Sequence, residues 1–157
     1  MYEELYCGTN YFRMDGDPVV YQLIYTSSAT PDLDDFALRE IAHSSNLNNQ
    51  QRGITGLLLF HEGSIMQVLE GDEMSVYSLY GKIKQDNRHT GCMILSTRES
   101  QEREFSEWFM GYKNVSSSSG IDTLFNLNRH SLANVMPHSP SQELETLTQT
   151  YAKVSGL

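Results

Sequence analysis

Two consecutive segments are apolar on both faces, and this pattern constrains the fold more than any other feature of the chain. They read GITGLLLF at residues 53–60 and IMQVLEG at residues 65–71, and a short HEG sequence joins them. Alternate side chains of a strand point to opposite faces, so a strand that is apolar at every position needs cover on both sides. The pattern predicts a β-hairpin inside a sheet that has a layer packed on each face.

Gln67 is the one amide side chain inside the second of these strands. It shares a face with Ile65 and Leu69, while Met66 and Val68 point the other way. Burying an amide without hydrogen-bond partners costs about 2 kcal/mol or more. We therefore expect a polar group to lie against Gln67.

The remaining patterns predict an α+β fold with the element order βαββαββ. Residues 19–27 alternate as a strand, with Tyr21, Leu23 and Tyr25 on one face. Thr30 and Pro31 have the character of an N-cap and first helical residue, with acidic residues following. A second helix, a strand at 92–97, a charged loop at 98–104 and a short edge strand at 105–112 complete the series. This order predicts a ferredoxin-like sandwich of two helices on a mixed sheet.

The C-terminal part is expected to cover the back of that sheet. SSSSG at residues 116–120 has the composition of a linker, IDTLFNL at 121–127 suggests a short amphipathic helix, and 141–154 shows helical spacing. We expect two C-terminal helices on the back of the sheet. The predicted organisation is an unassigned extension at 1–18, a domain at 19–113 and a helical cap at 114–157.

Composition excludes several classes of function. Eleven Lys and Arg stand against twenty Asp and Glu, a net charge of −9, which opposes direct binding to nucleic acid or to an anionic membrane. Two cysteines are too few for a disulfide framework, and no targeting or membrane-spanning pattern is present, so we expect a cytoplasmic protein. The histidines at 43, 61, 130 and 138 lack metal-ligand spacing, and no metal site is expected.

Five separated motifs resemble the BLUF family, the blue-light sensors that use FAD. They are IYTS around Tyr25, NLNNQQRGITG around Asn49, IMQVLEG around Gln67, IKQDNRH from Ile83, and FSEWFM ending at Met110. The match runs in the family's order over residues 19–113. The motifs address the flavin ring, so FAD rather than FMN follows from the resemblance alone.

The resemblance implies that the isoalloxazine ring lies between the two helices and that Tyr25 and Gln67 are the photoactive pair. Asn49 would pair with the ring's C4 carbonyl and N3 hydrogen, because an amide offers a donor and an acceptor without charge. Without the resemblance, Tyr25 is more readily a core tyrosine with a satisfied hydroxyl. An Asn-rich helix end is more often a C-cap, and this alternative stays open for Asn48.

Further positions follow from the same motifs. Lys82 occupies a position where the family often has Arg. Lysine keeps the positive charge but lacks the planar guanidinium that can make two parallel hydrogen bonds. Arg88 and His89 would lie near the ribityl and phosphate tail or form a structural turn. Trp108 and Met110 share one strand face and would carry the signal outward, or simply pack there. The other expected flavin contacts are Ile41, Ser45, Asn48, Ile83 and Asp86.

The implied mechanism is photochemical and not enzymatic. Light absorbed by FAD would draw an electron and then a proton from Tyr25 by way of Gln67, whose amide then rearranges. We expect the output to pass through the edge strand and the C-terminal helices to an unidentified protein partner or to the chain's own homo-oligomer, since no effector domain is evident.

Two other classes of function compete with this reading. A flavin reductase would need a nicotinamide site, but no GxGxxG sequence occurs. A flavin-free ferredoxin-like regulatory domain would explain the fold but would leave Gln67 and Asn49 without partners.

Overall fold

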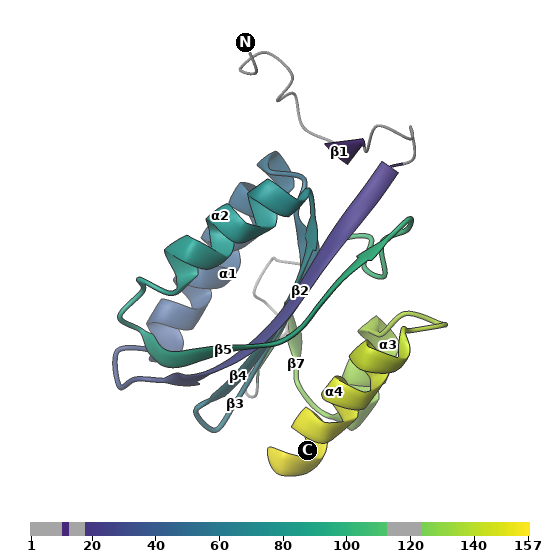
Figure 1. Cartoon of the computed structure of the whole chain (residues 1–157). Coiled ribbons are helices and arrows are strands. Elements are labelled where there is room, and N and C mark those ends of the chain that lie inside the picture. Colours follow the sequence, from purple (N-terminus) through teal and green to yellow (C-terminus); the bar gives the residue numbers. More distant parts are fainter. Residues whose placement is uncertain (1–10, 13–17, 113–123) are drawn as a thin grey trace.

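A computed structural model describes residues 11–12, 18–112 and 124–157, and shows one sheet between two pairs of helices (Figure 1). In chain order the elements are β1 (Tyr11–Phe12), β2 (Pro18–Ala29), α1 (Asp35–Gln51), β3 (Thr55–His61), β4 (Ser64–Gly71), α2 (Glu73–Ile83), β5 (His89–Ser100), β6 (Trp108–Tyr112), β7 (Leu124–Asn126), α3 (Arg129–Val135) and α4 (Gln142–Val154).

The elements from β2 to β6 follow the predicted βαββαββ order, which confirms the ferredoxin-like α+β class. The main strands are arranged β5-β2-β4-β3-β6-β7, with β1 paired to the start of β2. The pairs that β2 makes with β4 and β5, and the β3–β4 hairpin, are antiparallel, whereas β6 is parallel to both β3 and β7. The sheet is therefore mixed, as predicted.

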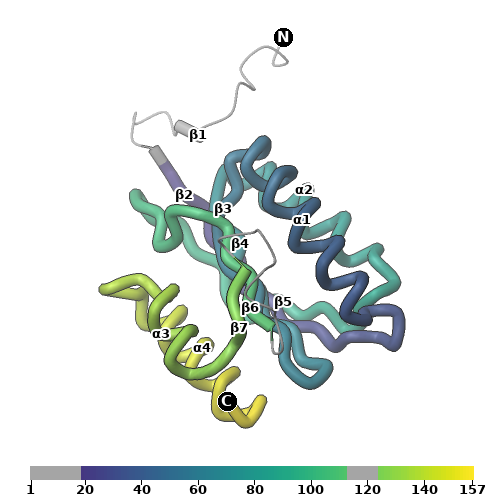
Figure 2. The backbone as a smooth tube through the Cα atoms, turned by 180° about the vertical axis from the view of Figure 1, so that it is seen from behind, coloured from purple at the N-terminus to yellow at the C-terminus, as the bar shows by residue number. Residues whose placement is uncertain are grey.

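Each face of the sheet buries its own core. On the front face, which α1 and α2 cover, Leu23, Tyr25 and Leu69 pack with the two helices. On the back face, which α3 and α4 cover, the core includes Ile24 and Val68. Figures 1 and 2 show the two helix pairs on opposite sides of the sheet. Strands β3 and β4 are buried on both faces, as their apolar runs predicted.

The first helix begins later than predicted. Asp34, and not Thr30, is its N-cap, and the Asp34 carboxylate accepts the Ala37 N–H at 2.8 Å. The Thr30 hydroxyl instead donates to the Asn87 carbonyl oxygen at 2.8 Å, which ties the end of β2 to the connection that precedes β5. Thr and Asp are both suited to the N-cap position, but the Thr30 hydroxyl is engaged in this tertiary contact and Asp34 caps the helix.

Two predictions about the end of the sheet were wrong. Strand β6 is not at the edge, because β7 pairs with it in parallel from Met110↔Leu124 to Tyr112↔Asn126. Residues 124–126, expected in a helix over 121–127, therefore form a strand. The backbone groups on the outer side of β6 need partners, and this segment supplies them. The predicted linker at 116–120 lies outside the described residues.

The two back-face helices are present, with one displaced. Helix α4 lies within the predicted range 141–154, and Ser141 is its N-cap. Helix α3 begins after Asn128, which forms a reciprocal capping box with Ser131. Strand β5 continues to Ser100, so the charged loop is shorter than predicted. Among the described residues, no helix is both long and apolar enough to cross a membrane.

Candidate flavin site

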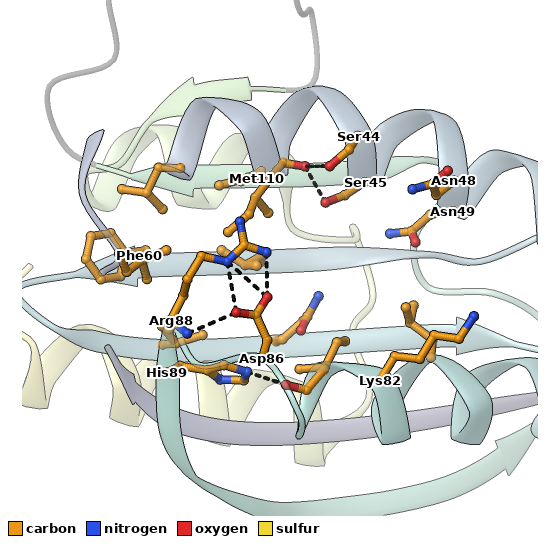
Figure 3. A pocket seen from close by; sticks show the side chains of 18 of the residues that line it. Ser44, Ser45, Asn48, Asn49, Phe60, Lys82, Asp86, Arg88, His89 and Met110 are labelled. Carbon is orange, nitrogen blue, oxygen red and sulfur yellow. Dashed lines mark hydrogen bonds and ion pairs between the residues drawn. The ribbon is translucent and has the colours of Figure 1, made fainter. Parts of the chain in front are cut away.

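A cavity of about 240 Å³ lies between α1, α2 and the front face of the sheet. All eleven residues predicted to contact a cofactor line it: Tyr25, Ile41, Ser45, Asn48, Asn49, Gln67, Lys82, Ile83, Asp86, Arg88 and His89. Met110 lines it too. The helices contribute its two side walls, and strands β2, β3, β4 and β6 contribute its floor (Figure 3).

Tyr25 and Gln67 meet at the floor of the cavity. They are direct cross-strand partners in the β2–β4 ladder, so their side chains share the front face. The Tyr25 hydroxyl donates a hydrogen bond to Gln67 Oε1, and both residues are almost fully buried. Burial raises the pKa of Tyr25 well above its usual value, with a smaller effect from Cys92. The phenol therefore holds its proton at neutral pH.

Two buried amides face the cavity with unused hydrogen-bonding groups. Gln67 Oε1 accepts the hydrogen bond from Tyr25, and no described residue bonds the side-chain nitrogen of Gln67. Asn49 is 3 % exposed, and neither atom of its side-chain amide bonds a described residue. The unbonded amide atoms of Asn49 and Gln67 are not among the fully buried atoms that lack a partner. They therefore remain accessible to a bound molecule. A molecule that offers both donors and acceptors would satisfy them.

The walls combine apolar and polar surface. Ile41 on α1 and Ile83 on α2 are half-buried and line opposite walls. The Ser45 hydroxyl donates to the Ile41 carbonyl oxygen, one turn earlier on α1. Asn48 is exposed and lies in the last turn, and the helix is capped by Arg52, so the C-cap alternative for Asn48 is wrong.

Asp86 and Arg88, which both line the cavity, bind each other. Figure 3 shows the two side chains turned toward one another, and Arg88 Nε lies 2.9 and 3.0 Å from the two carboxylate oxygens. These contacts with Arg88 hold the pKa of Asp86 below its usual value. Lys82 extends from α2 as an exposed cation that lines the cavity (Figure 3).

His89 is held at both ring nitrogens. Nε2 lies 2.5 Å from the Ile83 carbonyl oxygen, which can only accept, so Nε2 carries the proton there. Nδ1 lies 2.9 Å from the Ser27 hydroxyl, which can donate to it. These contacts connect α2, β5 and β2, which favours the structural-turn alternative for His89 over a direct contact with a cofactor tail.

Met110 and Trp108 lie at different distances from the photoactive pair. In the ladder, Met110 pairs with Leu58, which pairs with Gln67, which pairs with Tyr25, so Met110 lies in the same row. Trp108 lies two residues back on the same face, is 3 % exposed, and does not line the cavity. No described residue bonds its buried indole nitrogen.

Several residues in or behind the cavity lining were missed from the sequence. Arg52, one turn beyond Asn48, lines the cavity, and its place at the end of α1 beside the NLNNQQ motif was an available signal. Tyr80 packs behind the pair, with its ring centroid 5.2 Å from that of Tyr25. Tyr80 lies on α2 and is itself buried. The described residues hold no cluster of His, Cys, Asp or Glu that could bind a metal ion.

This fold and cavity define a small ligand-binding α+β domain, and comparison with known proteins gives the family. The model for "Sensors of blue-light using FAD" matches residues 20–111, and the chain belongs to this BLUF family, whose members are flavin-binding blue-light sensors. It is 38 % identical over 94 residues, 59 % of this chain, to photoactivated adenylate cyclase subunit beta of Euglena gracilis. The match covers 11 % of that relative, so the chain spans about a tenth of the length of the curated relatives.

Solved structures agree with this assignment. The BLUF domain of BlrP1 superposes with a TM-score of 0.67 at 25 % identity, covering 87 % of this chain and 91 % of that one. The photo-activated state of BlsA gives a TM-score of 0.60 at 25 % identity, covering 81 % and 90 %.

The cavity fits the ring of FAD, the chromophore of the family. Its volume is below the roughly 300–1,000 Å³ of sites that enclose a whole drug-sized ligand, which suits the tricyclic ring and not the whole dinucleotide. Apolar side walls match the flat faces of the ring, and the unpaired amides of Asn49 and Gln67 match its polar edge.

Proposed function

We propose that Tyr25 and Gln67 are the photoactive pair of this blue-light sensor. The observation that carries the proposal is the Tyr25–Gln67 hydrogen bond in the floor of a cavity where Asn49 presents an unpaired buried amide. When bound, FAD supplies blue-light absorption and an oxidising excited state. Tyr25 would give an electron to this oxidant and a proton to Gln67 Oε1, which already accepts its hydrogen bond, and an electron and a proton would return to Tyr25 once the Gln67 amide has rearranged, so that no net oxidation remains.

Gln67 converts this transfer into a lasting change of hydrogen bonding. An amide that has taken a proton on oxygen can return one from nitrogen, or rotate, and so exchange donor for acceptor without keeping a charge. One hydrogen bond is worth about 0.5–1.5 kcal/mol net, which shifts a two-state population by up to roughly tenfold. This magnitude suffices for a reversible switch.

The other predicted contacts hold the ring in place. Asn49 fixes the polar edge of the ring, Ile41 and Ile83 enclose its faces, and Ser45 and Asn48 line the α1 side. Lys82 supplies a positive charge without a bidentate fork. The Asp86–Arg88 pair lines the cavity with a net charge near zero, which suits a neutral ring more than a phosphate.

Met110 and Trp108 are proposed to carry the signal away from Gln67. Met110 shares the row of the photoactive pair, so a new Gln67 geometry changes its packing first. Trp108 follows on the same strand, and its unpaired indole N–H is available for an alternative partner. Strand β6 would pass the change to β7 and then toward α3.

We propose that the chain has no catalytic activity of its own and acts in the cytoplasm on a protein partner or through its own assembly. The cyclase activity named in the Euglena relatives belongs to proteins about ten times longer than the matched segment. The domain organisation 1–18, 19–113 and 114–157 is part of the same proposal.

The test is an absorption spectrum of the FAD-bound protein before and after a blue flash, followed through dark recovery. We expect a reversible shift to longer wavelength, and Gln67→Leu should bind flavin yet abolish it. A wild-type spectrum that does not change would contradict the proposal. An unchanged shift in the Gln67→Leu variant would remove the amide from the mechanism.

A further inference from the structure

The glutamate of the IMQVLEG motif, Glu70, has no part in the flavin site, yet it is fully buried. It lies three residues beyond Gln67 on β4, and an odd offset places it on the opposite, back face of the sheet. Its cross-strand partner is Gln22, which lies three residues before Tyr25 on β2. The Tyr25–Gln67 pair on the front face is thus accompanied by a Gln22–Glu70 pair on the back face of the same two strands.

The amide of Gln22 connects two carboxylates. Its nitrogen donates to Glu70 Oε1 at 2.8 Å and to Glu104 Oε2 at 2.7 Å, and its oxygen accepts from Arg98 Nε at 3.0 Å. Every hydrogen-bonding group of this 1 % exposed side chain is used. Arg98 also pairs with Glu104, with 2.7 Å between Nη2 and Oε2.

Glu70 also fixes the loop between β5 and β6. Its carboxylate accepts the backbone N–H of Glu104 at 3.0 and 3.1 Å and that of Phe105 at 2.9 Å. The side chain of Phe105 is in turn buried in the back-face core. Burial raises the pKa of Glu70, and these backbone hydrogen bonds oppose the rise.

The chain of contacts ends at the start of α4. Glu104 accepts hydrogen bonds from the backbone N–H and, at 3.1 Å, from the hydroxyl of Ser141. Ser141 is the N-cap of α4, and its hydroxyl oxygen accepts from Leu144 N at 3.3 Å. The first turn of α4 is thereby attached to β2 and β4 through side-chain hydrogen bonds.

We propose that Gln22, Glu70 and Glu104 form a relay that couples the two photoactive strands to the N-terminus of α4, on the side of the sheet opposite the flavin. The inference rests on the proposed function, because the relay carries a change that starts at Tyr25 and Gln67. A displacement of β2 against β4 alters the Gln22–Glu70 geometry directly, and Gln22 shares its amide nitrogen with Glu104. Gln22 acts here as a positioning residue that touches neither the ring nor the photoactive pair.

The test is hydrogen–deuterium exchange of the FAD-bound full chain, in the dark and under blue light, read at residues 141–147. In the wild type we expect light to change the exchange rate of this first turn by roughly two- to tenfold, the range that one hydrogen bond supports. Gln22→Met keeps a long unbranched side chain but removes all three hydrogen bonds. This variant should retain the red shift and lose the light-dependent change at 141–147.

Ile24→Val is the matched control, since Ile24 lies on the same strand and back face and contributes only packing. It should keep both the red shift and the exchange response. If Gln22→Met does not fold, Glu104→Leu interrupts the same chain one step later and takes its place. The relay alone would be overturned if either relay variant responded to light at 141–147 as the wild type does. It would also be overturned if the wild-type protein showed the red shift but no light-dependent change in exchange. A wild type without a red shift would contradict the proposed function and the relay with it.

Discussion

At the residue scale, the hydroxyl of Tyr25 is the group on which the photochemistry depends. Tyr25→Phe keeps the ring that packs against Tyr80 but removes the donor to Gln67 Oε1. We expect the variant to bind FAD and to lose the light-induced red shift, because no electron and proton leave a phenyl ring in this way. A flash difference spectrum measures this outcome.

Tyr21 offers a control on the same strand and the same face. Its hydroxyl bonds the Tyr77 hydroxyl at 2.7 Å, away from the cavity. Tyr21→Phe should therefore leave the red shift intact. A shift that persists in Tyr25→Phe would remove Tyr25 from its proposed role.

Asn49 makes a second prediction at this scale, on affinity. Asn49→Ala removes the unpaired buried amide, and two lost hydrogen bonds amount to about 1–3 kcal/mol, so we expect FAD affinity to fall by roughly thirtyfold at the middle of that range. Titration of the apoprotein with FAD would measure the change in Kd. Gln50→Ala, at the exposed neighbouring position of α1, should leave Kd unchanged, and an unaltered Kd in Asn49→Ala would contradict the assignment.

The cavity residues could be predicted because five local sequence motifs resemble those of the BLUF family. Their partners could not. Asp86 and Arg88 bind each other, which depends on the side-chain conformations that the folded turn permits. Glu70 was not predicted as a buried carboxylate, because a charge is buried only where tertiary contacts satisfy it, and Gln22 and two backbone N–H groups come from distant segments.

At the element scale, strand periods were reliable and element ends were not. The alternation of β2, β4 and β6 gave the correct face for each residue, since one face of a pleated strand is fixed by parity. Leu124 and Leu127 fit a helical spacing equally well, and only the open side of β6 decides for a strand there. The spacing of apolar residues within 121–127 does not show that β6, elsewhere in the chain, has an edge without a strand partner.

The start of α1 gives a test of the same point. Asp34→Ala removes the N-cap that accepts from Ala37 N, and should lower the free energy of unfolding by about 0.5–2 kcal/mol. Chemical denaturation of the FAD-free protein would measure this. Asp32→Ala, at an exposed position outside the helix, should stay near the wild-type value. Equal effects of the two substitutions would place the cap elsewhere.

At the scale of the whole molecule, a net charge of −9 opposes self-association, but one surface favours it. On β5, which pairs only with β2 among the described strands, Met93, Ile94 and Leu95 are three consecutive exposed apolar residues, at 58 %, 41 % and 39 %. Such a run on an acidic protein suits a second copy of the chain once the repulsion between copies is screened.

Self-association should accordingly strengthen with salt, because ions screen the charge and leave the apolar attraction in place. Sedimentation velocity should show a weight-average mass that rises with sodium chloride for the wild type. Leu95→Glu adds a charge within the apolar run and should hold the protein as a monomer at every salt concentration. Val154→Glu, at an apolar position of α4 that is 80 % exposed, matches the change in charge and should associate like the wild type. If both variants lose association equally, the net charge of the protein and not the β5 surface governs self-association. A wild-type protein that stays monomeric in high salt would contradict the homo-oligomer itself.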